Sequence, residues 1–173
     1  MNLELTEEQI ALRNTVRQFL AEKASVAGHV RPLLDDPTGS TDAVWRGLAN
    51  LGATGVVVPA EHDGAGMTMV EAGVVAEELG AALYPGPWLS SAVASARALT
   101  RTGADNGLLA EIACGTTIAT VAPFTGAQPV ADGTTLRGQL TAVPDAAAAN
   151  VLLVLADESV SYTHLTLPTN REV

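Results

Sequence analysis

A glycine-rich connector between two predicted helices, residues 49–68, most strongly limits what this chain can fold into. It reads ANLGATGVVVPAEHDGAGMT. Gly52 and Gly55 can take the positive φ that ends a helix, and the valines and proline that follow break the helical period. Thr68 then forms a capping box with Glu71, which starts the next helix. The segment therefore predicts two helices joined by a short, stiff and closely packed connector.

Apolar residues at helical spacing predict five helices in the first two thirds of the chain. Thr6 and Gln9 form a capping box before the first helix. Glycines stand where the third, fourth and fifth helices are expected to end, at Gly80, Gly103 and Gly115. Short joints between helices favour an antiparallel bundle. The expected helices cover approximately residues 6–23, 41–51, 69–79, 88–102 and 106–114.

After Gly115 the pattern changes from helical spacing to β-branched runs. Residues 116–122, 134–143 and 151–155 are strand candidates, with Gly138 as a candidate bulge. The prediction is a mainly α protein with a β segment, in which an N-terminal antiparallel helical bundle is followed by an incomplete β domain.

Three regions are expected from these patterns. Residues 1–115 form the helical domain and residues 116–159 a partial middle β domain. Residues 160–173, which end in SYTHLTLPTNREV, depart from the alanine- and valine-rich usage before them and are expected to be a non-native tail. A divergent native terminus is the alternative for this tail.

Composition excludes several classes of function. A net charge of −10 disfavours nucleic acids and anionic membranes as partners. Cys114 is the single cysteine, so the chain has no internal disulfide. His29, His62 and His164 lack the spacing of metal ligands, and no metal site is predicted. Without a basic, apolar leader or an apolar run of about 20 residues, a cytoplasmic protein with no membrane span is expected.

The order of several short motifs resembles the N-terminal domain of the acyl-CoA dehydrogenases. The resemblance continues more loosely beyond the helices and covers roughly residues 3–157. It implies an FAD-dependent enzyme that dehydrogenates an acyl-CoA thioester between Cα and Cβ, acts as a homo- or hetero-oligomer, and passes electrons to an electron-transfer flavoprotein. The motifs lie at residues 45–52, 57–59, 64–66 and 77–80, with looser matches at 108–115 and 136–154.

The resemblance also implies where ligands bind. The family's flavin motif, Thr-Glu-Pro followed by Gly-Ser-Asp, is reduced here to Pro123 and Gly126. Backbone contacts do not require particular side chains, so the strand before Pro123 is still expected to contact FAD. One alternative is that this strand is a plain strand without a ligand. For the apolar residues of the fourth predicted helix, the alternative to an acyl path is an ordinary helical core. The expected cofactor-binding residues are Thr120, Val121 and Ala122, and the residues expected to line the acyl path are Leu89, Val93 and Ala96.

No catalytic residue is assigned. In the family the base is a glutamate of a C-terminal helical bundle, which has no counterpart in these 173 residues. The chain is therefore expected to be a truncated enzyme that is inactive alone. The alternatives are a non-catalytic subunit of a heteromeric acyl-CoA dehydrogenase and a helical binding module. The glutamates expected to act only as caps, dipole partners or solvated side chains are Glu61, Glu71, Glu77, Glu78 and Glu111.

Overall fold

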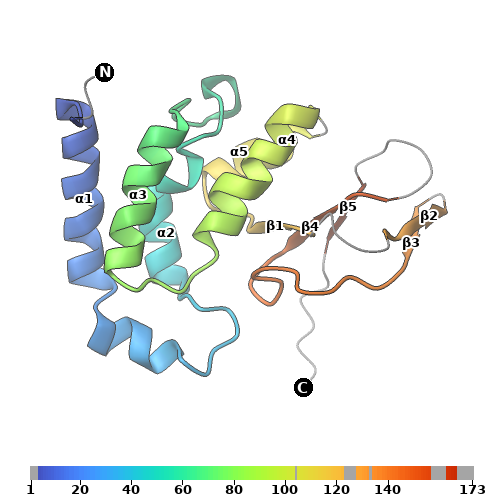
Figure 1. Cartoon of the computed structure of the whole chain (residues 1–173), viewed down its shortest axis with the longest axis horizontal. Coiled ribbons are helices and arrows are strands. Elements are labelled where there is room, and N and C mark those ends of the chain that lie inside the picture. Colours follow the sequence, from blue (N-terminus) through green and yellow to red (C-terminus); the bar gives the residue numbers. More distant parts are fainter. Residues whose placement is uncertain (1–3, 104, 123–127, 133, 157–162, 167–173) are drawn as a thin grey trace.

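A computed structural model describes residues 4–103, 105–122, 128–132, 134–156 and 163–166. It confirms the predicted class, because a helical bundle is followed by a small β segment (Figure 1). The α-helices are α1 (Glu7–Lys23), α2 (Asp42–Asn50), α3 (Met69–Ala81), α4 (Ala96–Thr102) and α5 (Asn106–Ala113). Two π-helices, η1 (Val26–Val30) and η5 (Leu89–Ser95), and three 3-10 helices, η2 (Arg31–Leu33), η3 (Ala53–Gly55) and η4 (Ala60–His62), complete the helical part that the structure describes.

The helices begin at the predicted caps, but one helix does not end at the predicted glycine. The capping boxes at Thr6 and Thr68 are both formed. Helix α4 ends at Gly103, which has a φ of 64°. The prediction that Gly80 ends α3 is wrong, because the helix continues to Ala81 and the left-handed residue is Leu83, with a φ of 55°.

The connector after α2 is as closely packed as its sequence predicts. Residues 53–58 are all buried. Gly52 supplies the left-handed turn, with a φ of 76°, while Gly55 lies inside η3, so the positive φ predicted for Gly55 is wrong. A Cβ on Gly64 would lie 2.0 Å from the Val58 carbonyl oxygen. Close backbone approach therefore requires glycine at that position.

Helices α1 and α3 are joined by two polar contacts. The Gln9 side-chain amide donates to Glu71 over 2.7 Å, and Arg17 forms an ion pair with Glu78. The expectation that Glu78 is a cap, a dipole partner or a solvated residue is wrong, because its side chain is only 3% exposed and is bound by Arg17. An acidic side chain buried against the first helix therefore helps to fix the bundle.

The β segment contains five short strands in its described part. They are β1 (Ala119–Val121), β2 (Val130–Asp132), β3 (Thr135–Arg137), β4 (Val151–Val154) and β5 (Thr163–Thr166). Strand β4 lies between β1, which is parallel to it, and β5, which is antiparallel, while β2 and β3 form a separate antiparallel pair.

All three predicted strands are shorter than expected. The run 134–143 forms a strand only over Thr135–Arg137, and the left-handed residue Ala142, with a φ of 54°, turns the chain soon afterwards. Gly138 follows this strand and packs on Pro129, so it is not a bulge within the ladder. The partner strand β2 was not predicted from the sequence.

The predicted division into residues 1–115, 116–159 and 160–173 stays a prediction. Helix α5 ends at Ala113, and β1 begins at Ala119. Strand β5 lies within the segment predicted as a tail, most of which lies outside the described residues. Among the helices that the structure describes, none is both long and apolar enough to cross a membrane.

Candidate flavin and thioester site

The two sets of predicted site residues come from neighbouring elements, β1 and η5. The π-helix packs directly against the strand, where the yellow-green helical stretch leading into α4 meets β1 in Figure 1. The Ala119 backbone N–H donates to the Ser91 hydroxyl oxygen over 3.1 Å. The predicted flavin strand therefore lies beside the predicted acyl helix.

Backbone hydrogen bonds show which edge of β1 faces its neighbour β4. The Ile118 carbonyl accepts from the Val151 N–H, and the Ala122 N–H donates to the Leu153 carbonyl at 2.9 Å. Successive residues of a strand direct their backbone groups to opposite edges. Ala119 and Val121 thus direct their N–H and C=O groups away from β4.

The three predicted flavin contacts are consequently not equivalent. The backbone of Thr120 faces β4, and its fully buried hydroxyl donates to the Pro144 carbonyl over 2.7 Å. The N–H of Ala122 is already bonded to β4. Val121, which is half-buried, has its backbone groups on the other edge. Pro123 and Gly126 lie outside the described residues.

The three residues predicted to line the acyl path do not share one environment. Ala96 is fully buried and Val93 is 8% exposed, whereas Leu89 is 64% exposed. A π-helix has more residues per turn than an α-helix, which rotates Leu89 away from the line expected at α-helical spacing. The Ser95 hydroxyl donates to the Ser90 carbonyl over 2.8 Å within this wide turn. Ser95 is the only residue of this bond that contributes a side chain, because Ser90 contributes its backbone carbonyl.

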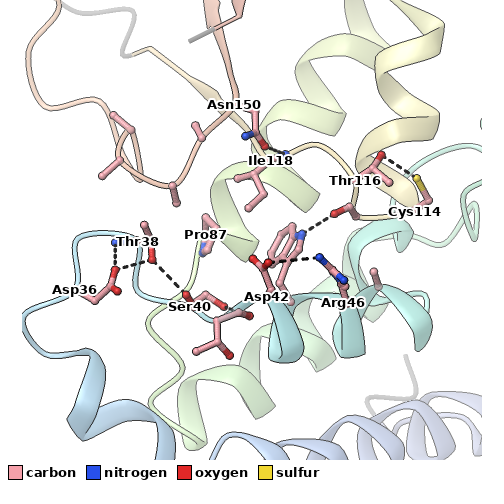
Figure 2. Close-up of a pocket in the computed structure, with 18 of the residues that line it drawn as sticks. Asp36, Thr38, Ser40, Asp42, Arg46, Pro87, Cys114, Thr116, Ile118 and Asn150 are labelled. Carbon is pink, nitrogen blue, oxygen red and sulfur yellow. Dashed lines mark hydrogen bonds and ion pairs between the residues drawn. The ribbon is translucent and has the colours of Figure 1, made fainter. Parts of the chain in front are cut away.

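A separate cleft lies on another side of the helix–sheet junction (Figure 2). Its volume is about 1060 Å³. The start of α2, the link between α5 and β1, and the turn at residues 146–150 form its walls. Trp45 and Gly115 both line the cleft, and the Trp45 indole N–H donates to the Gly115 carbonyl over 2.9 Å. None of the six predicted site residues lines this cleft, which sequence reasoning did not find.

The strongest electrostatic perturbations lie away from β1 and η5. Hydrogen bonds from Gln9 and Thr68 lower the pKa of Glu71 to about 2. Burial lowers the pKa of His29, whose ring stacks on Tyr84 with 6.0 Å between centroids. Burial also raises the pKa of Tyr84 to about 12. Among the described residues, no cluster of three or more potential metal ligands occurs.

Three of the described glutamates are held by other groups. Glu71 accepts from Thr68 and Gln9, and Glu78 accepts from Arg17. The Thr117 hydroxyl donates to Glu111 over 2.6 Å. These three carboxylates therefore have structural partners.

Comparison with known proteins identifies the family. The family described as "Acyl-CoA dehydrogenase, N-terminal domain" matches residues 6–107. Acyl-CoA dehydrogenase IpdE2 of Mycobacterium tuberculosis is 36% identical over 113 residues, which are 65% of this chain and 35% of IpdE2. The chain thus spans about a third of the length of this relative.

Solved structures agree with the sequence match. The Tcur3481-Tcur3483 steroid ACAD superposes with a TM-score of 0.75 at 29% identity, over 87% of this chain and 45% of that chain. The ChsE4-ChsE5 complex from Mycobacterium tuberculosis superposes with a TM-score of 0.71 at 23% identity, over 96% and 49% of the two chains, and this likeness shows the fold alone. By its family match and its helical bundle joined to a β segment, the chain belongs to the acyl-CoA dehydrogenase family.

Proposed function

We propose that this chain forms one wall of an FAD-dependent acyl-CoA dehydrogenase site and needs further polypeptide to complete it. The observation that carries the proposal is the edge of β1, where Val121 directs an N–H and a C=O away from β4 and beside η5. The isoalloxazine ring has donors and acceptors along one edge, so a backbone N–H and C=O that face away from β4 fit it. A solved glutaryl-CoA dehydrogenase from Mycobacterium smegmatis, which shares this fold, is described in complex with FADH2.

In this proposal the chain orients and shields the reactants. The Val121 backbone would hold the flavin edge, and Val93, with the fully buried Ala96 behind it, would form part of an apolar wall that excludes water beside the acyl chain. When bound, the flavin supplies the redox chemistry by accepting a hydride from the thioester. Leu89, which is exposed, would lie at the rim of that wall.

The proton acceptor would come from polypeptide outside this chain. The carboxylates of Glu71, Glu78 and Glu111 are already bound by Thr68, Arg17 and Thr117 respectively. A base must lie within hydrogen-bond reach of the proton that it removes. The proposal therefore assigns no catalytic residue here and predicts no turnover by the 173-residue chain alone.

A mixed assembly is the second arrangement that the comparisons favour. The Tcur3481-Tcur3483 structure, at 29% identity, is named for two proteins and as a steroid ACAD. The corresponding proposal is that this chain is a non-catalytic partner in a heteromeric enzyme that oxidises a bulky acyl-CoA and reduces an electron-transfer flavoprotein.

Co-expression tests the proposal. The chain would be purified alone and together with a second acyl-CoA dehydrogenase subunit, and both preparations would be assayed for FAD absorbance and for acyl-CoA oxidation with an artificial electron acceptor. We expect flavin and turnover in the assembly and no turnover by the chain alone. Turnover by the isolated chain would refute the assignment of the base to other polypeptide.

Straight-chain and steroid-side-chain acyl-CoA thioesters would be compared in the same assay. Faster oxidation of the steroid thioester is expected for a relative of a steroid ACAD. A preference for short straight chains would refute the bulky-substrate part of the proposal and would not affect the proposed flavin site.

A further inference from the structure

Two adjacent serines of η5 bind the β segment through their hydroxyl groups. Ser91 is fully buried, and its hydroxyl oxygen accepts from the Ala119 N–H over 3.1 Å. Ser90 is 8% exposed, and its hydroxyl donates to the Asp145 carboxylate. Both side chains leave the helix toward the strand and the turn beside it.

The Ser91 contact lies on the edge of β1 that also presents Val121. Ala119 and Val121 are two residues apart, so their backbone groups face the same edge. The Ser91 hydroxyl satisfies the N–H of Ala119, which β4 does not reach. A buried N–H without a partner is costly, so this bond fixes where the edge lies against the helix.

The Ser90 contact fixes the turn that supports the same strand. Asp145 has a left-handed backbone, with a φ of 49°, and its carboxylate accepts from Ser90. The adjacent Pro144 carbonyl accepts from the buried hydroxyl of Thr120. The turn is therefore held both by η5 and by β1.

We infer that Ser91 is a positioning residue, which holds β1 so that the Val121 backbone meets the flavin, and that Ser90 supports it through Asp145. The inference rests on the proposed function for its flavin role. Neither serine touches the reactants in this assignment. The two serines act by fixing the distance between η5 and the edge of β1.

Amide exchange and FAD titration, both followed by NMR on the labelled 173-residue chain, test the inference. Ser91→Ala should speed exchange at Ala119 by about fivefold to tenfold, the effect of losing one hydrogen bond of about 1 kcal/mol. Exchange within α1 should not change. Ser91→Cys, whose thiol is a weak acceptor, should restore part of the protection and also keeps the test valid if the alanine variant folds poorly.

Thr100→Ala is the matched control. Its hydroxyl donates to the Ala96 carbonyl within the same helical stretch, so its loss should leave the exchange of Ala119 unchanged. The FAD affinity is read from the shift of the Val121 amide signal during the titration. Ser91→Ala should weaken this affinity by about fivefold, and Ser91→Cys should weaken it less.

The possible results test the positioning role of Ser91, its link to the flavin, and the flavin site separately. Unchanged exchange at Ala119 in Ser91→Ala would overturn the positioning role. Faster exchange with unchanged FAD affinity would overturn the link between Ser91 and the flavin. No response of Val121 to FAD in the unaltered chain would instead overturn the proposed flavin site, while the exchange rates would still decide whether Ser91 holds the strand.

Discussion

The guanidinium of Arg17 donates to both carboxylate oxygens of Glu78, at 2.8 and 2.7 Å, and so joins α1 to α3. Arg17 is 59% exposed, whereas Glu78 is 3% exposed. The hydrogen bond from Arg17 lowers the pKa of Glu78 despite its burial. Arg17 is therefore the main group that keeps this carboxylate charged inside the bundle, with a smaller contribution from the charge of Arg13.

Arg17→Ala is expected to destabilise the fold by about 1–3 kcal/mol, because it leaves the buried Glu78 carboxylate without its main partner. Urea unfolding followed by helical circular dichroism would measure the loss. Arg46→Ala is the control, since Arg46 and Asp42 are 75% and 92% exposed, and it should change stability by less than about 1 kcal/mol. Equal effects of the two variants would contradict the role given to Glu78.

Glu71 should make stability depend on acid pH. Its pKa falls from 4.5 to about 2 in the folded chain, so the unfolded state binds a proton first as the pH drops. Its contribution is complete above about pH 4.5 and is lost between pH 4.5 and 2. Glu71→Gln should flatten the stability profile in that window, whereas the exposed Glu61→Gln should not. Identical profiles would refute this assignment.

His29 should act at a higher pH and through a different cause. Burial lowers its pKa below 6.5 in the folded chain, so the unfolded chain takes up the proton more readily. Stability should therefore decrease as the pH falls below about 6.5. His29→Phe keeps a ring to stack on Tyr84 and should remove this decrease, with His62→Gln as control. A decrease that persists in His29→Phe would exclude this histidine as its source.

Replacing a glycine by alanine should have opposite effects on stability inside a helix and in a tight turn. A Cβ on Gly80 meets nothing within 4 Å, and Gly80 lies inside α3, so Gly80→Ala should stabilise by about 0.5–1 kcal/mol. Gly64→Ala should destabilise, because its Cβ would clash with the Val58 carbonyl. Thermal melts of both variants measure whether each substitution raises or lowers the stability of the fold. A loss of stability in Gly80→Ala would mean that this residue ends the helix after all.

Much of the helical part could be predicted because local chemistry decides it. The Thr6 and Thr68 capping boxes and the left-handed Gly103 act within one turn of the chain. Gly80 failed as a stop signal because the left-handed turn falls at Leu83 instead, where the Tyr84 N–H donates to the Leu79 carbonyl over 2.9 Å. The β2–β3 pair failed because its strands depend on a cross-strand partner, Val130 with Arg137, that local periodicity does not reveal.

The candidate site was predictable only in outline. The family resemblance predicted flavin contacts at residues 120–122 and an acyl path along the helix from Leu89, and the structure packs β1 on η5. Sequence alone did not indicate that Val121 differs from its neighbours, since that depends on which edge β4 occupies. It also did not reveal the π-helical turn that exposes Leu89. The assignment of these six residues to ligands stays a prediction.

Titration of the labelled chain with FAD, followed through its backbone amide signals, tests the central claim most directly. The account predicts that the Val121 amide shifts on addition of FAD while the Thr120 amide, which faces β4, shifts little, and that signals of α1 stay in place. Saturating FAD that leaves Val121 unmoved, or that moves only residues of the cleft beside Trp45, would contradict it.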